Sequence, residues 1–285
     1  MAKEKKFTHK DQINFQNLSG DCNPIHVDKN AALKTHAGQQ IVHGIHIFLW
    51  ALDSVNVKLF SNLKVDIKFM SQVNLNTKLT AVINKSKNRI TVTSNNGLLC
   101  HCIINIEKIE NLEKNVISND NVLFNIKKSR PDNNKIHYIK EGQKSYKLYG
   151  GRNKSIGKQM FPNITKNYGL EFLYEVACTS SITGMKVPGL HSLFLRLTLL
   201  LSYKNKKNYI KIKKINDKLK FVSINYYGIN FGAKLETIFR PEPIKTRPFS
   251  FLKKKYGRSN YLKNTKVLVI GGSRGIGAYV AKLCS

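Results

Sequence analysis

Two short stretches near the start of the chain carry the residue types that acid–base chemistry needs. The first reads LSGDCNPIH and holds a carboxylate, Asp21, and an imidazole, His26. Because Pro24 pushes Asn23 out of the helical region and donates no backbone hydrogen bond, this loop must fold back. We expect Asp21 and His26 to meet around one water molecule. At this spacing alone, a polar turn with a surface histidine is the plainer interpretation.

The second stretch, QIVHGIH, changes that interpretation. His43 and Gly44 stand at the start of an apolar run, where a helix would leave unpaired backbone N–H groups and the positive end of its dipole. Gly44 would let a substrate approach the backbone, and a carbonyl oxygen placed there would be polarised as in an oxyanion hole. Water beside an acid–base pair and a polarised carbonyl suits addition to, or elimination from, an α,β-unsaturated thioester.

The elements that would position these residues follow in sequence. Residues 40–59 are apolar on nearly every side, which predicts a helix surrounded by protein. Alternating patterns then predict antiparallel strands, the last two of which Asn95–Gly97 joins in a hairpin. The expected strands cover residues 64–69, 77–84, 89–94 and 98–106. A curved sheet wrapped around a central helix satisfies both patterns.

The same order of elements returns after a polar, aperiodic linker. A helical pattern at residues 167–182 precedes four further strand-like runs, so we expect an internal structural repeat. The expected strands cover residues 192–202, 209–215, 218–226 and 231–239. A basic, proline-bearing linker follows, and then an apolar run at 266–270 that predicts a buried strand leading through glycines into a helix.

The motif F-T-x-x-D-x-x-x-F-x-x-L-S-G-D-x-N-P-I-H, followed by I-V-H-G, resembles the MaoC-like, or R-specific enoyl-thioester hydratase, family of hot-dog folds. The resemblance covers roughly the first hundred residues. It implies that Asp21 and His26 are catalytic and that the Gly44 amide binds the thioester oxygen. Asn23 and His43 are further candidates to line the substrate. The family also implies a helix wrapped by a sheet and paired with a second copy.

Two later motifs carry a weaker resemblance. Residues 181–185 and 188–192 resemble the second module of hydratase-like proteins fused to short-chain dehydrogenases, which implies a degenerate hot dog that completes the sheet and lines an acyl pocket. A second catalytic centre at His191 is the less favoured alternative.

The loop Gly271-x-x-x-Gly275-x-Gly277 resembles the cofactor loop of short-chain dehydrogenases, and Arg274 would favour NADP. One βα unit cannot form a dinucleotide crevice. We therefore expect a truncated dehydrogenase start, with NADP bound only if a complete dehydrogenase domain followed.

The expected fold class is α+β, a double hot-dog plus a truncated Rossmann-type βα unit. The expected divisions are a hot-dog with the catalytic motif at 1–110, a linker at 111–140, a second, degenerate hot-dog at 141–243, a basic linker at 244–263 and the dehydrogenase start at 264–285.

Composition limits the partners. The net charge is +31, from 48 basic and 17 acidic residues, but the lysines are scattered and no nucleic-acid motif is present. We expect no nucleic-acid partner and an attraction for the phosphates of coenzyme A or of an acidic carrier protein. With no signal peptide or spanning apolar run, a cytoplasmic protein without membrane insertion is expected. The five cysteines suggest neither disulfides nor a metal site, and a homodimer is compatible with the family.

The expected function is a hydro-lyase that interconverts (3R)-hydroxyacyl and trans-2-enoyl thioesters of coenzyme A or acyl carrier protein in fatty-acid-type metabolism, without a cofactor. The alternative is a non-catalytic remnant of a bifunctional dehydratase–oxidoreductase that only binds acyl thioesters.

Overall fold

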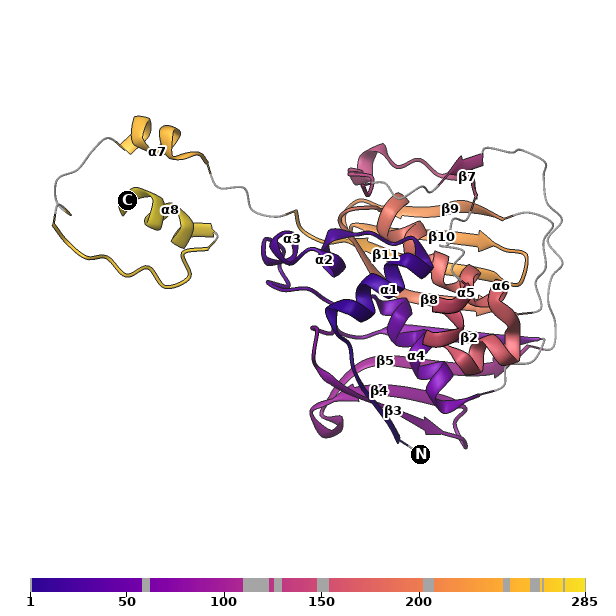
Figure 1. The fold of residues 1–285 in the computed structure, drawn as a ribbon. Helices are drawn as coiled ribbons and strands as arrows, with labels where there is room; N and C mark the ends of the chain where they lie inside the picture. Colours follow the sequence, from indigo (N-terminus) through magenta and orange to yellow (C-terminus); the bar gives the residue numbers. More distant parts are fainter. Residues whose placement is uncertain are drawn as a thin grey trace.

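The computed structural model describes residues 2–57, 62–109, 123–125, 130–147, 154–201, 208–242, 247–256, 262, 264–273 and 275–284. The strands of these residues form one 11-stranded sheet (Figure 1). Its order is β1 (Ala2–Lys6), β3 (Lys78–Asn84), β4 (Arg89–Ser94), β5 (Leu99–Lys108), β2 (Leu63–Phe69), β8 (Ser192–Leu200), β11 (Gly232–Phe239), β10 (Phe221–Tyr227), β9 (Tyr209–Asn216), β7 (Gly142–Lys147) and β6 (Leu123–Asn125).

The first half wraps its sheet around helix α4 (Gly44–Val55). Nine consecutive residues of α4, Ile45–Asp53, are buried, as the apolar sequence predicted. The helix begins four residues later than expected because Ile41 forms a bridge with Asn74 in extended backbone. The four predicted strands are β2 to β5, and a short helical turn, η1 (Asn95–Gly97), makes the predicted hairpin.

The second half repeats this arrangement. Helices α5 (Lys154–Met160) and α6 (Pro162–Ser181) are followed by a π-helical turn, η3 (Ile182–Lys186), and by β8 to β11. The helix-then-strands order predicted for both halves is therefore confirmed. The sequence patterns did not indicate β1, which pairs with β3, or the short strands β6 and β7.

The two halves meet where β2 pairs antiparallel with β8. Arg196 on β8 donates to both carboxylate oxygens of Asp66 on β2, at 2.5 and 2.9 Å. In front of this seam, α4 packs against α6 (Figure 1). The Asp53 carboxylate near the end of α4 accepts from the backbone N–H of Ile164 in the first turn of α6, at 2.8 Å. One sheet and one helical layer thus hold both halves together.

Only parts of the predicted linkers lie within the described residues, which omit 110–122, 126–129, 243–246, 257–261 and 263. The predicted basic linker at 244–263 includes helix α7 (Phe249–Tyr256). Within the first linker, a short helical turn, η2 (Ile136–Tyr138), is formed. The backbone of Asp132 exchanges hydrogen bonds with Met185 and Leu190, so this part of the linker follows the second half closely.

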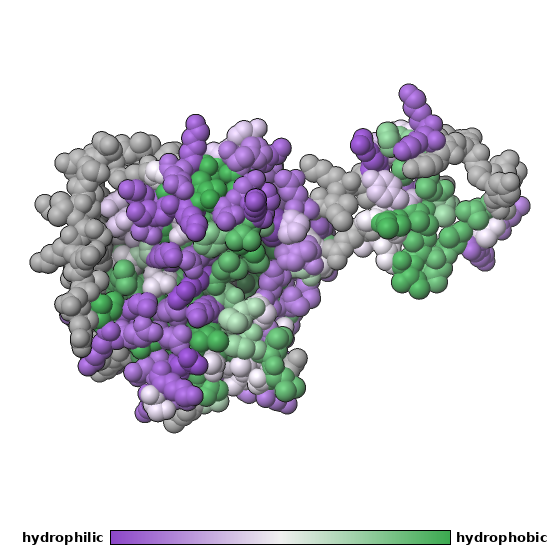
Figure 2. Space-filling view, turned by 180° about the vertical axis from the view of Figure 1, so that it is seen from behind, coloured by the Kyte–Doolittle hydropathy of each residue, from purple (hydrophilic) through white to green (hydrophobic). Residues whose placement is uncertain are grey.

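The C-terminal part forms two helices, α7 (Phe249–Tyr256) and α8 (Gly275–Cys284), apart from the main sheet (Figure 1). The expected helix is present as α8 but begins already at Gly275, within the glycine loop, and residues 266–270 do not form the expected strand. A parallel strand needs a neighbour for its backbone groups, and no described strand pairs with this segment. Leu268 and Ile270 are 87% and 89% exposed. Figure 2 shows apolar side chains gathered on this part of the molecule. The truncated Rossmann-type unit remains a prediction.

The helices of the described residues are too short or too polar to cross a bilayer. The longest, α6, has 20 residues and carries Lys166, Glu171 and Glu175.

Candidate functional site

The loop that holds Asp21 is shaped by the helices on either side. Helix α1 (His9–Ser19) ends at Gly20, whose positive φ of 76° turns the chain out of the helix. The Asp21 carboxylate then accepts from the Asn23 backbone N–H at 3.1 Å. Asn23 caps the short helix α2 (Pro24–Val27), where proline occupies the first position. The loop therefore folds back as expected, and His26 lies in a single helical turn.

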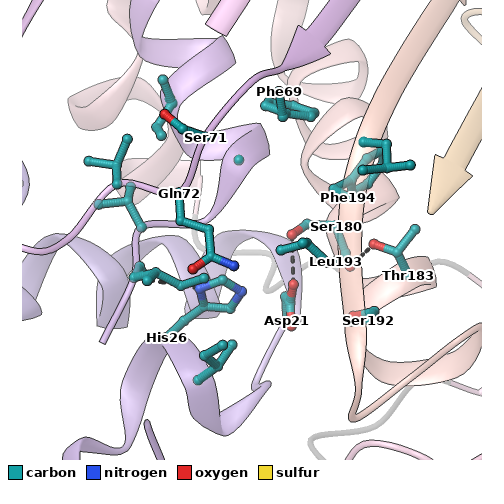
Figure 3. A pocket seen from close by; sticks show the side chains of 18 of the residues that line it. Asp21, His26, Phe69, Ser71, Gln72, Ser180, Thr183, Ser192, Leu193 and Phe194 are labelled. Atoms are coloured by element: carbon teal, nitrogen blue, oxygen red, sulfur yellow. Dashed lines mark hydrogen bonds between the residues drawn. The ribbon is translucent and has the colours of Figure 1, made fainter. Parts of the chain in front are cut away.

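The structure brings Asp21 and His26 together. A carboxylate oxygen of Asp21, a ring nitrogen of His26 and a ring nitrogen of His43 all lie within 4.8 Å of one another. His26 Nδ1 lies 2.8 Å from the carbonyl oxygen of Ile41. Because a carbonyl only accepts, Nδ1 carries the proton and Nε2 of the neutral ring keeps its lone pair. Figure 3 shows the two side chains side by side at one end of a cavity.

The cavity has a volume of about 290 Å³ and is formed by both halves. Asp21, His26 and Gly44 lie on its wall, so the three residues predicted to be catalytic or to bind oxygen share one space. A Cβ at Gly44 would lie 3.0 Å from Phe69 Cε1, so the Phe69 ring would have to shift slightly to admit a side chain there. The remaining lining is mostly apolar, with a few polar groups: Ile25, Ile41, Val42, Ile47, Phe69, Met70, Ser71, Gln72, Val73, Ser180, Thr183, Gly184, Ser192, Leu193, Phe194 and Leu195.

The second half holds the Asp21 carboxylate in place. Ser180 at the end of α6 donates its hydroxyl to Asp21 Oδ2 at 2.6 Å (Figure 3). A Cβ at Gly184 would lie 2.6 Å from the same oxygen and closer still to Oδ1, so only glycine fits beside this carboxylate. The Cys22 backbone N–H donates to Met185 Sδ at 3.2 Å. Sequence reasoning missed Ser180, although Gly184 and Met185 belong to a motif that it singled out.

Asn23 and His43 differ from the expectation that they line the substrate. Neither is among the residues that border the cavity. Asn23 Nδ2 donates to the carbonyl oxygens of Gly184 and Leu190, at 3.0 and 3.2 Å, and so ties the loop to the second half. His43 is fully buried behind the loop, with its ring stacked 3.8 Å from that of His26. Asn23 and His43 therefore hold the loop and the His26 ring in place without bordering the cavity.

Burial moves the pKa values of the pair in opposite directions. It raises the pKa of Asp21 to about 6, against the hydrogen bonds from Ser180 and Asn23, which stabilise the carboxylate. It lowers the pKa of His26 to about 4, helped by the positive charge of Arg240 and opposed by the Ile41 carbonyl. At neutral pH the site therefore holds an ionised carboxylate and a neutral imidazole.

Asp21, His26 and His43 are close enough to be considered as metal ligands. The stacked rings of His26 and His43 are inclined by only 24°, so their lone pairs lie in nearly parallel planes. Both nitrogens of His43 also lie beside oxygen acceptors, Gln12 Oε1 at 2.8 Å and the Asp21 carbonyl at 3.3 Å. The arrangement favours an acid–base pair over a metal centre.

The glycine loop near the C-terminus leads directly into α8. Gly271 and Gly275 have positive φ values of 77° and 59°, and a Cβ at Gly277 would collide with the Gly271 carbonyl. Arg274 lies outside the described residues. Because residues 266–270 pair with no described strand, the described residues do not form a dinucleotide crevice.

Comparisons with known proteins found similarity to a family model and to solved structures. The family model described as "MaoC like domain" matches residues 1–98. No match is found among curated proteins. Among solved structures, the (R)-hydratase from A. caviae involved in PHA biosynthesis is 23% identical, with 38% of this chain and 92% of that chain covered and a TM-score of 0.30. A putative MaoC domain protein dehydratase from Chloroflexus aurantiacus is 9% identical, with coverages of 85% and 95% and a TM-score of 0.48.

The full-length peroxisomal multifunctional enzyme type 2 from Drosophila melanogaster is 7% identical, with a TM-score of 0.44. The match covers 85% of this chain and 48% of that chain. The match of the family model includes the loop with Asp21 and His26 and the start of α4. Residues 1–98 are thus similar to a MaoC-like domain.

Proposed function

We propose that the protein is a hydro-lyase that interconverts (3R)-hydroxyacyl and trans-2-enoyl thioesters of coenzyme A or acyl carrier protein. One observation carries the proposal: Asp21 and His26 approach within 4.8 Å on the wall of a largely apolar cavity that Gly44 also borders. The match of residues 1–98 to a MaoC-like domain supports the same class of reaction.

The geometry assigns a part to each group. The Gly44 N–H at the start of α4 polarises the thioester carbonyl and stabilises the enolate-like oxygen. Water held between Asp21 and His26 Nε2 gives a proton to the pair as its oxygen adds to C3, and the pair returns a proton to C2. Dehydration reverses these steps, so protons balance and no cofactor is consumed. The thioester is activated while the apolar wall holds the acyl chain.

The direct test follows the absorbance of the conjugated enoyl thioester. Asp21→Asn and His26→Ala are each expected to lower kcat/KM by about 100-fold or more. Asp28→Asn and His137→Ala change the same residue types at exposed positions away from this cavity and are expected to leave the rate unchanged. Unchanged rates in both site variants would reject the assignment, and tight acyl-thioester binding without turnover would favour the non-catalytic alternative.

The charge of the chain supports the choice of thioester carrier. A net charge of +31 attracts the phosphates of coenzyme A or an acidic carrier protein over a long range. Comparing crotonyl thioesters of coenzyme A and of acyl carrier protein at low and high salt tests this part of the proposal. If KM does not rise with salt for either carrier, electrostatic attraction does not contribute to binding of the thioester.

A further inference from the structure

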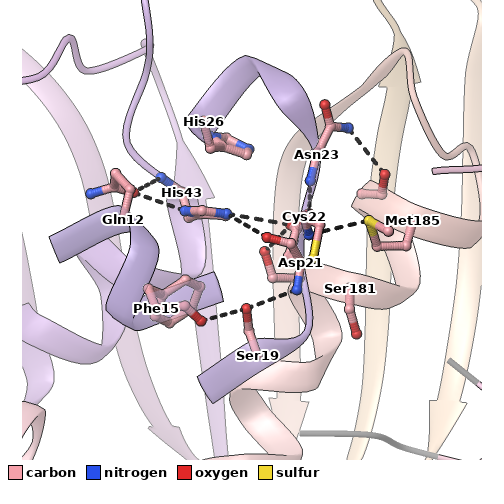
Figure 4. Close-up of polar contacts among 12 residues, drawn as sticks. Gln12, Phe15, Ser19, Asp21, Cys22, Asn23, His26, His43, Ser181 and Met185 are labelled. Carbon is pink, nitrogen blue, oxygen red and sulfur yellow. Dashed lines mark hydrogen bonds and ion pairs between the residues drawn. The ribbon is translucent and has the colours of Figure 1, made fainter. Parts of the chain in front are cut away.

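The ring of His43 lies between two oxygen acceptors (Figure 4). On one side, Nδ1 is 2.8 Å from Gln12 Oε1. On the other, Nε2 is 3.3 Å from the Asp21 carbonyl oxygen and 3.9 Å from Asp21 Oδ2. Burial holds the pKa of His43 well below its usual range, so the ring is neutral and has one N–H for two acceptors.

Gln12 decides which nitrogen carries that proton. Its Oε1 also accepts from the His43 backbone N–H, at 3.1 Å. Rotating the carboxamide by half a turn would place its NH₂ group against this N–H, donor against donor. The oxygen is therefore fixed toward the ring, and Nδ1 must be the protonated nitrogen. Gln12 is fully buried, and its Nε2 has no partner among the described residues, so only its oxygen contributes hydrogen bonds.

The other nitrogen consequently presents a lone pair to Asp21. We propose that Gln12 is a positioning residue that fixes the Nδ1–H tautomer of His43, and that the Nε2 lone pair of His43 thereby makes Asp21 a stronger base. A lone pair beside a carboxylate disfavours its ionised form, whereas an N–H at the same place would favour it. The inference rests on the proposed function, because it explains how the carboxylate of the acid–base pair is tuned.

Other groups around His43 do not supply this effect. His26 stacks on the ring from α2, and His46 lies one turn further along α4 with its pKa lowered to about 3, so both neighbours are neutral at pH 7. Phe15 of α1 packs against the ring at 5.0 Å. Within the described residues, Gln12 is the polar side chain bound to Nδ1 and Asp21 is the acid beside Nε2.

Nitrogen NMR of the full-length protein labelled at histidine tests the tautomer without any need for activity. In the unmodified protein, His43 is expected to show a protonated Nδ1 and an unprotonated Nε2. Gln12→Met keeps the length of the side chain but removes its oxygen, so the proton should move to Nε2 and donate to the Asp21 carbonyl. Gln12→Glu retains an acceptor and should keep Nδ1 protonated. A protonated Nε2 in the unmodified protein overturns the proposal, even if no variant folds.

The pH profile of kcat/KM gives the second readout. In Gln12→Met, the part of the pH profile that reports the ionisation of Asp21 should move to lower pH by roughly 1 unit or less. The change should affect kcat more than KM. Gln16→Met, which changes a partly buried glutamine of the same helix, should leave this part of the profile in place. If the pH profile of Gln12→Met does not move, the proposal that His43 makes Asp21 a stronger base is wrong. If Asp21→Asn and His26→Ala both retain full activity, the proposed function fails instead, while the tautomer measurement still stands.

Discussion

Replacing Ser180 by alanine should raise the pKa of Asp21. The Ser180 hydroxyl donates to Asp21 Oδ2 at 2.6 Å, and this hydrogen bond stabilises the ionised carboxylate. Asp21 is only 2% exposed, so bulk solvent does little to compensate for the missing donor. A hydrogen bond to a charged group contributes roughly 1.5–3 kcal/mol. At about 1.4 kcal/mol for each pKa unit, its loss should raise the pKa from about 6 by roughly 1–2 units.

The same change alters the pH dependence of stability. In the native protein the pKa of Asp21 lies at about 6, above the ordinary value of 3.8, so protonation favours the folded state. That contribution, about 3 kcal/mol from the difference between the two values, is fully present below pH 4 and is lost as the pH rises through 6. In Ser180→Ala the loss should continue to about pH 7–8. The variant should therefore be destabilised by roughly 1.5–3 kcal/mol at alkaline pH and by much less at pH 5.

Two measurements check this prediction. Urea unfolding at several pH values gives the difference in the free energy of unfolding, and the pH profile of enoyl-thioester hydration gives the limb of Asp21, which should move to higher pH. Ser181→Ala is a matched control, because the Ser181 hydroxyl is also buried but donates to the Cys178 carbonyl of its own helix. Equal pH dependence in Ser180→Ala and Ser181→Ala would refute the reasoning.

Three further changes test separate parts of the site. Gly184→Ala should lower kcat/KM by about 100-fold or more, because its Cβ would displace the carboxylate beside it; a near-normal rate would show that the carboxylate does not need this position. Arg240→Met removes a positive charge that lowers the pKa of His26, so an NMR titration should show that pKa rising from about 4, and a constant value would contradict the stated cause. Glu175→Gln should reduce the free energy of unfolding by roughly 1–3 kcal/mol, since the buried carboxylate accepts from Tyr226 and two Asn230 donors. For Glu175→Gln, a normal hydration rate per folded molecule is expected. An unchanged denaturation midpoint would show that the Glu175 carboxylate does not stabilise the fold.

Local patterns predicted the elements well where a short stretch determines its own structure. In α1, Thr8 and Asp11 form a capping box at the start and Gly20 ends the helix, so both ends follow from local residue types. The fold-back of the loop follows from Pro24, which starts α2 and so places His26 one turn beyond Asn23.

Contacts between distant parts of the chain were not predictable in the same way. Ser180 meets Asp21 across 159 positions, and its own neighbourhood has the pattern of an ordinary buried helix end. Gln12 offered a clearer signal, since it lies three residues before Phe15 on the buried face of α1, where a polar side chain needs a reason. At residues 266–270 the sequence predicted a strand that the structure does not form. An apolar run forms a strand only where a partner strand is available, and no described strand pairs with this one.

The pairing of β2 with β8 has a consequence for stoichiometry. When two identical chains build a site between them, symmetry repeats every substitution in both copies. Here the groups that border the cavity come from different positions of one polypeptide, so Gly184 can be altered while Gly44 stays unchanged. Under the proposed function, the described residues provide one acyl-thioester site at this seam, and titration is expected to saturate at one equivalent per chain along a simple hyperbola.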